Sequence, residues 1–199
     1  LLWRHGRASR ALLVFWDNTA AAIQLSTIGE NNSTVATLYN NMANAYDEIG
    51  HKGEALNYYK KSLKIRMKVF NGNHPEIAES YYNIGNLYDS QNDLQQALAN
   101  WSQAVTLYRN AYGENSNDVA DTYENMAMTY ETFNLIQKAL ELETKELRIR
   151  CYLLGPEHPK VKKAQRIINR LQQKWLLDDS QVRCVCRSEK WMLVYSELT

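Results

Sequence analysis

A period of 42 residues constrains what this chain can fold into more than any other feature of its sequence. Similar side chains recur at three successive positions of that period. They include Tyr39, Tyr81 and Tyr123, then Asn41, Asn83 and Asn125, then Tyr46, Tyr88 and Tyr130, and then Ala55, Ala97 and Ala139. A fixed period of about 20 to 50 residues is typical of stacked repeats. It predicts three full repeats here, over residues 32–73, 74–115 and 116–157.

Each repeat contains the apolar pattern of two helices. In the first repeat, Val35, Tyr39 and Met42 recur at steps of three and four residues, which place them on one face of a helix. Gly50 then interrupts the pattern, and asparagine holds the same place in the two later repeats. Both residue types tolerate the left-handed backbone that often ends a helix. A second periodic segment begins near Ala55, so we expect a helix–turn–helix unit in each repeat.

The pairs His74-Pro75 and His158-Pro159 lie where a new unit begins. Proline is favoured at the first position of a helix, because the N–H that it lacks would have no partner there. The residue before it, or Ser116 in the third repeat, is then expected to cap the helix. Of these, only Ser116 is a favoured capping type.

Eight positions of the repeat resemble the tetratricopeptide signature of large, Leu, small, aromatic, Gly, Ala, aromatic and small residues. The first repeat matches with Tyr39, Met42, Ala43, Tyr46, Gly50, Ala55, Tyr59 and Ser62, and the second with Tyr81, Ile84, Gly85, Tyr88, Asn92, Ala97, Trp101 and Ala104. The repeat length and the His-Pro start resemble the kinesin light chain type. The resemblance implies an all-α fold, a right-handed α-solenoid of stacked helix–turn–helix repeats.

The third repeat matches the signature less completely. Its first helix carries the expected residues, but Glu143 and Glu146 stand where an aromatic and a small residue are expected. This departure puts the packing and the register of its second helix in question.

The two ends of the chain depart from the full repeat. We expect residues 1–31 to form a degenerate half-repeat with one helix, and residues 158–177 to form a capping helix with a wet outer face. For residues 178–199 we expect a poorly ordered tail or a piece of another domain. The outer face of the capping helix is basic, and the same cations also suit an acidic partner. They are Lys160, Lys162, Lys163, Arg166, Arg170 and Lys174.

Composition excludes several classes of partner. The net charge of +1 gives no reason to expect nucleic acid or an anionic membrane surface. No apolar run approaches the roughly 18 residues of a membrane span. We expect a cytoplasmic protein. Because the chain does not begin with Met, we also expect a fragment or a processed chain.

No motif in the sequence indicates catalysis. There is no glycine-rich phosphate loop, no nucleophile elbow around a serine and no His-Glu-x-x-His pattern. Cys184 and Cys186 have a metal-like spacing, but a structural zinc site needs four ligands and no second pair lies nearby. We therefore predict no cofactor, no metal and no enzymatic activity.

The resemblance implies a binding site instead. In tetratricopeptide arrays the first helix of each repeat lines a concave groove that holds a partner peptide. By position, the predicted groove residues are Asn40, Asn44, Asp47, Glu79, Tyr82, Asn86, Asp89, Asp121, Glu124, Met128 and Glu131. Asparagine suits this role, because its side chain both donates to and accepts from a peptide backbone.

The predicted partner is a protein or peptide with a basic segment and an apolar anchor. Six of the groove residues are acidic and none is basic, so a cationic peptide should be attracted and its binding should weaken with salt. Tyr82 and Met128 are the expected anchor positions. The compensating cations are expected on second helices and on the C-terminal helix. On the second helices they are Lys60, Lys61, Lys64 and Lys68.

Three functional interpretations follow. The chain is an adaptor or scaffold that docks a partner peptide, or the sensor or regulatory repeat region of a larger signalling protein. The third interpretation is a non-catalytic fragment of a repeat-bearing enzyme. A coiled coil or a nucleotide-binding domain before Leu1 would separate the first two, and a catalytic motif beyond Thr199 would indicate the third.

Overall fold

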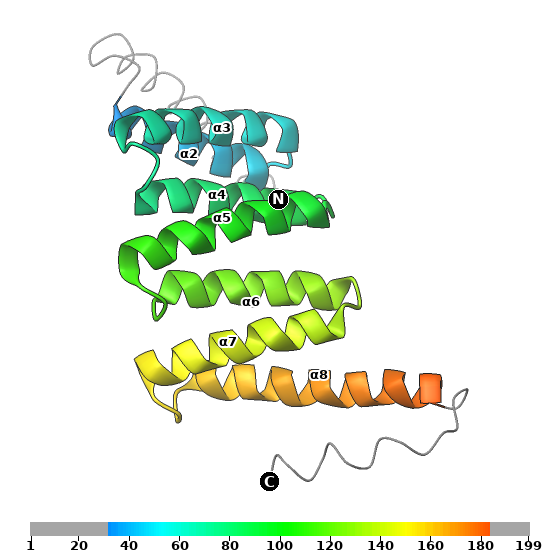
Figure 1. Ribbon diagram of the computed structural model, residues 1–199. Coiled ribbons are helices and arrows are strands. Elements are labelled where there is room, and N and C mark those ends of the chain that lie inside the picture. The colour runs from blue at the N-terminus through cyan, green and yellow to red at the C-terminus, as the bar shows by residue number, and fades with distance from the viewer. Residues whose placement is uncertain (1–31, 184–199) are drawn as a thin grey trace, which may run out of the picture.

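The computed structural model describes residues 32–183, with side chains to residue 176. Within that range it contains seven helices and no strand (Figure 1). They are α2 (Ser33–Glu48), α3 (Lys52–Val69), α4 (Pro75–Asp89), α5 (Leu94–Tyr112), α6 (Asn117–Thr132), α7 (Ile136–Leu154) and α8 (Pro159–Arg183). The predicted half-repeat over residues 1–31 and most of the predicted tail lie outside the described residues.

The helices form antiparallel pairs that stack in chain order. The extensive contacts are those of α2 with α3, α4 with α5, and α6 with α7, and each pair then packs against the next helix along the chain. Figure 1 shows the pairs as successive layers, with α8 against α7 at one end. The predicted all-α repeat solenoid is confirmed for the described residues.

The helix starts follow the caps that the sequence suggested. Ser116 Oγ accepts a hydrogen bond from the backbone N–H of Val119 at 3.3 Å. At the two His-Pro starts an imidazole nitrogen has this role. His74 Nδ1 accepts from the N–H of Glu76 at 3.2 Å, and His158 Nδ1 accepts from the N–H of Lys160 at the same distance. Each cap satisfies a backbone donor that the helix itself cannot pair.

The turns inside the repeats have left-handed backbone at the predicted residues. Gly50, Asn92 and Asn134 have φ values of 86°, 60° and 58°. Glycine and asparagine adopt this conformation at low cost, so the chain reverses here without strain.

Close helix packing within the second repeat depends on a glycine. Gly85 of α4 faces the indole of Trp101 on α5, and a Cβ atom at Gly85 would lie 2.5 Å from Trp101 Cδ1. Ala43 and Ala127 hold the equivalent positions of the other repeats and are buried. Small residues at this position allow the paired helices to approach.

The second helix of the third repeat keeps the register of the others. Ala139 and Ile149 are buried along α7, as Ala55 and Ile65 are at the same positions of the first repeat. Glu143 and Glu146 are buried too, in the places of an aromatic and a small residue. The departure from the signature therefore changes the chemistry of this helix interface and leaves its register intact.

Helix α8 packs against α7, the second helix of the third repeat. Val161, Ala164, Ile168 and Leu171 are buried, and Leu171 packs with Ile136 and Ala139 of α7. The helix runs to Arg183, six residues beyond the predicted end at residue 177. No helix among residues 32–183 is long and apolar enough to cross a membrane.

Candidate functional site

The first helices of successive repeats, α2, α4 and α6, are joined by polar side chains along one surface, which we call the first-helix face. Asn83 Nδ2 donates to Asn40 Oδ1 at 3.1 Å, and Asn125 Nδ2 donates to the Tyr82 hydroxyl at 2.8 Å. Each bond connects residues about one repeat apart. Each bond thus joins a predicted groove residue, Asn40 or Tyr82, to an asparagine of the next first helix that was not among the predicted groove residues.

The asparagines of the predicted site are engaged within the protein. Asn40 was predicted to present its amide to a ligand, but its side chain is buried, with 4% of the residue exposed. Asn86 Oδ1 accepts from Trp101 Nε1 at 3.0 Å, and Asn44 Oδ1 accepts from the Tyr59 hydroxyl. The Asn44 and Asn86 bonds connect a first helix to a second helix, and Asn40 bonds to Asn83 of the next first helix, so these side chains use part of their hydrogen-bonding capacity within the protein.

Two buried arginines form ion pairs with acidic residues of the first-helix face. Arg66 of α3 lies 3.3 Å from a carboxylate oxygen of Glu76 and 3.2 Å from one of Glu79. Its guanidinium also donates to the Ser80 hydroxyl at 2.9 Å. Because charged groups are rarely buried without a partner, these contacts account for the burial of Arg66.

The second arginine, Arg150 of α7, is fully buried. Its guanidinium pairs with Asp121 and with Glu124 of α6, and its Nε lies 2.8 Å from a carboxylate oxygen of Glu146. Burial alone would lower the pKa of Arg150, but its hydrogen bonds with Asp121 and Glu146 and their negative charges raise it overall. One cation therefore meets three carboxylates at this interface.

Helix α8 supplies two further cations. Lys163 Nζ lies 2.6 Å from Glu124, and Arg170 Nη2 lies 2.6 Å from Glu131. Near the other end of the stack, Lys52 pairs with Asp47. The cations that form ion pairs with the site thus come from second helices and from the C-terminal helix, and they are other residues than the four second-helix lysines named from the sequence. The cations that pair with the site are Lys52, Arg66, Arg150, Lys163 and Arg170.

The two arginines were missed in the sequence, although a signal was present. Arg66 and Arg150 occupy the same repeat position, two periods apart. An arginine that recurs on the inner face of a second helix needs acidic partners, and the first helices offer them.

The predicted anchor residues differ in accessibility. Met128 of α6 is 56% exposed, so a ligand can reach its side chain. Tyr82 of α4 is half-buried, and its hydroxyl already accepts from Asn125. Burial raises the pKa of Tyr82, so the phenol stays neutral. Met128 is the better contact for an apolar group.

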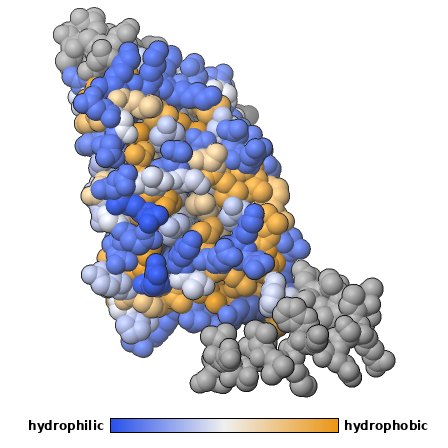
Figure 2. Space-filling model, viewed as in Figure 1, coloured by the Kyte–Doolittle hydropathy of each residue, from blue (hydrophilic) through white to orange (hydrophobic). Residues whose placement is uncertain are grey.

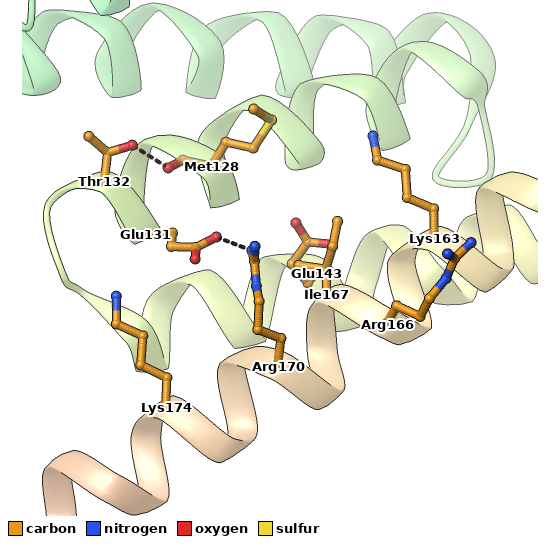
Figure 3. Close-up of a pocket in the computed structure, with 9 residues that line it drawn as sticks. All are labelled: Met128, Glu131, Thr132, Glu143, Lys163, Arg166, Ile167, Arg170 and Lys174. Atoms are coloured by element: carbon orange, nitrogen blue, oxygen red, sulfur yellow. Dashed lines mark hydrogen bonds and ion pairs between the residues drawn. The ribbon is translucent and has the colours of Figure 1, made fainter.

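A pocket of about 690 Å³ opens beside Met128, between α6, α7 and α8 (Figure 3). Its lining residues are Met128, Glu131, Thr132, Glu143, Lys163, Arg166, Ile167, Arg170 and Lys174. A smaller cavity of about 80 Å³ lies next to it, bounded by Glu124, Glu143 and Glu146. We call the larger space the C-terminal pocket.

Apolar side chains also reach the surface elsewhere. Figure 2 shows hydrophobic residues gathered along the right-hand edge, near the level of the α6–α7 turn. Phe133 and Leu135 belong to this turn and are exposed. Within the described part of the chain, no group of three or more His, Cys, Asp or Glu side chains is arranged to hold a metal ion.

Solved structures share this architecture. BtubC (BKLC) from P. vanneervenii is 17% identical with a TM-score of 0.75, over 96% of this chain and 82% of that one. A structure from Podosopora anserina, described as kinesin light chain nearly identical TPR-like repeats, is 21% identical with a TM-score of 0.73. The similarity covers 90% of this chain and 87% of that one. A second structure of the same Podosopora anserina repeats, with one substitution, is 22% identical with a TM-score of 0.72, over 92% and 91% of the two chains.

Sequence comparison gives the family directly. None of the curated protein sequences matches the chain. Profiles described as tetratricopeptide repeat match residues 36–66, 54–100 and 91–151, which together span more than half of the 199 residues. With the stacked helix pairs and the inter-repeat polar bonds, these matches show that the chain belongs to the tetratricopeptide repeat family.

Proposed function

We propose that this chain is a protein-interaction scaffold that binds a segment of a partner protein along its first-helix face. Tetratricopeptide repeats are generally interaction scaffolds, and the described residues form a stack of them. The bound segment has a basic stretch beside an apolar residue.

An excess of carboxylates on the first-helix face supports this proposal. Arg66 faces two carboxylates and Arg150 faces three. Asp89 accepts a hydrogen bond from the Thr129 hydroxyl at 2.6 Å and has no cationic partner among the described residues. The face therefore stays negative after its internal ion pairs form, and lysine or arginine of a ligand would complement it.

The apolar part of the ligand has a contact at Met128. This side chain is exposed, flexible and polarizable, and such residues accommodate apolar groups of different shapes. Exposed ion pairs contribute only about 0.2–1 kcal/mol each, so an apolar contact is needed for useful affinity.

The test uses a fluorescently labelled, lysine-rich peptide with a central leucine, and the double variant Glu79→Gln, Asp89→Asn. Both substitutions remove charge and keep the shape of the side chain, and the new amide oxygen in place of the Asp89 carboxylate would still accept from Thr129. We expect each substitution to weaken binding by about 0.2–1 kcal/mol, and binding to weaken as salt rises. Fluorescence anisotropy measures both effects.

The matched control is Glu54→Gln with Glu141→Gln, which removes the same charge from exposed positions of the second helices α3 and α7. Its affinity should equal that of the wild type. Glu124 is avoided, because it holds two cations, Arg150 and Lys163. Among the described residues Glu79 faces only Arg66, which keeps Glu76 as a partner in the variant. The proposal fails if the peptide does not bind, or if the control weakens binding as much as the double variant does.

A further inference from the structure

The third repeat breaks a pairing that the first two repeats share. In the first repeat the Tyr59 hydroxyl donates to Asn44, and in the second Trp101 Nε1 donates to Asn86. Both pairs fill the space between the first and second helices. The same two positions of the third repeat hold Glu143 and Met128.

This replacement removes an aromatic ring from the α6–α7 interface. Glu143 and Met128 both line the C-terminal pocket, where the ring of an aromatic residue would otherwise stand (Figure 3). Glu143 is 2% exposed, and its Oε2 atom has no hydrogen-bond partner. The third repeat therefore lacks an aromatic ring at this interface and has instead a buried carboxyl oxygen without a hydrogen-bond partner. Such departures from regular packing are typical of functional sites.

Helix α8 surrounds the pocket with positive charge. Four cationic side chains line it, against the two carboxylates of Glu131 and Glu143. Lys163 and Arg170 reach across to carboxylates of α6. Arg166 and Lys174 are exposed and form no ion pair with a described residue, although Arg166 Nε donates to the carbonyl of Lys162. Their charges remain available to a ligand.

We propose that the C-terminal pocket binds an acidic segment of a partner protein, with Glu or Asp carboxylates near Arg166 and near Lys174, at opposite ends of the pocket, and an apolar neighbour against Met128 and Ile167. This inference deepens the proposed function and rests on it for the class of partner. It adds a second specificity element at the α8 end of the face, so the ligand there has the opposite charge from the one along α4 and α6.

Glu143 gives the pocket a side chain whose charge changes near neutral pH. Its carboxyl is faced by Glu146 of α7, by Glu124 and Glu131 of α6, and by Lys163 of α8. Burial and the neighbouring Glu146 raise the pKa of Glu143 to about 7. Protonation removes a negative charge from the wall of the pocket, which lowers its repulsion of an acidic ligand. Acidic segments should therefore bind more tightly at pH 6 than at pH 8.

The first test measures the binding of a labelled peptide of glutamate and leucine to the full chain, with a peptide of glutamine and leucine as its neutral counterpart. We expect the glutamate peptide alone to bind. The double variant Arg166→Gln, Lys174→Gln should weaken its binding about threefold or more. The control Lys162→Gln, Arg148→Gln removes equal charge outside the pocket and should leave binding unchanged, while circular dichroism confirms that every variant is folded.

The second test follows pH. The peptide glutamates stay ionised between pH 6 and pH 8, so a fall in affinity over this range reports a group of the protein. In Glu143→Gln the side chain is neutral at every pH, so we expect binding that is independent of pH.

Equal binding of the neutral peptide, or equal weakening by the control variant, would overturn the site. A wild-type affinity that rises with pH, or a pH dependence that Glu143→Gln leaves intact, would overturn the role of Glu143. The proposed function is tested by a different experiment, with the lysine-rich peptide and the Glu79 and Asp89 variants. Its failure can therefore be distinguished from failure of the C-terminal pocket.

Discussion

Single residues decide how closely the helices of this stack approach. Gly85 leaves no room for a methyl group, because a Cβ atom there would lie 2.5 Å from the indole of Trp101. Trp101 is buried and donates to Asn86, so it cannot move aside without losing that bond. The glycine and the tryptophan therefore depend on each other.

We predict that Gly85→Ala lowers the free energy of unfolding by about 1–3 kcal/mol through overpacking, as measured by thermal or urea denaturation. The control is Gly53→Ala on α3, where a Cβ atom meets nothing within 4 Å. That change should leave stability unchanged or raise it by about 0.5–1 kcal/mol, because alanine favours helix. A Gly85→Ala protein as stable as the wild type would show that Trp101 adapts freely.

Glu143 gives the fold a dependence on pH. Its pKa is about 7 in the folded protein, against an ordinary value of 4.5. Between these values the folded chain holds a proton that the unfolded chain has released. The stability from this proton is fully present below about pH 4.5 and is lost as the pH rises through 7.

The corresponding prediction concerns Glu143→Gln, which cannot ionise. At pH 8 the wild type buries a charged carboxylate, so the melting temperature of the variant should be higher. The difference should correspond to about 1–3 kcal/mol in the free energy of unfolding. The difference should shrink towards pH 5. If it is the same at both pH values, Glu143 does not titrate in this range.

The sequence predicted which helices carry the site residues better than it predicted what their side chains contact. The period aligned Asn44 with Asn86 and Asp47 with Asp89, and the structure places them on the first helices. The partners of these side chains lie on other helices. Aligning the repeats shows which residues are equivalent, but it does not show which residues contact each other. The burial of Asn40 was therefore not foreseen, and the buried arginines were not recognised.

At the scale of helices, starts and turns were easier to predict than the end of α8. His-Pro pairs, Gly50 and the turn asparagines fix the boundaries through local backbone chemistry. Residues 177–183 contain no glycine or proline, so nothing in the chain stops α8 there, and it runs to Arg183. The loss of the repeat pattern after residue 177 had suggested that the helix ends there, and the rest of the predicted tail lies outside the described residues.

Helix α8 is expected to stabilise the end of the stack through its buried stripe. Leu171 is 1% exposed and packs on α7, so Leu171→Ala should lower the free energy of unfolding by about 2–5 kcal/mol. Leu176→Ala on the same helix is the control, since Leu176 is 49% exposed and should tolerate the change with little loss. Chemical denaturation compares the two. Equal effects would mean that α8 does not pack as described.

At the scale of the whole molecule, the repeat period produces two different surfaces. The second helices are α3, α5 and α7, and the first helices are α2, α4 and α6. The first-helix face joins its repeats through hydrogen bonds between residues about one period apart, and it carries the excess of carboxylates. Each repeat contributes the same few positions, so an extended segment could contact all three in turn.

The most direct test of the account is site-specific photo-crosslinking of the bound lysine-rich peptide. A photoreactive amino acid is placed at one exposed residue of a first helix, Asn44 or Met128, or at one of a second helix, Gln103 or Glu141. We expect crosslinks from Asn44 and Met128 and none from the second-helix positions. Crosslinks from Gln103 or Glu141 that equal those from the first helices would contradict this expectation.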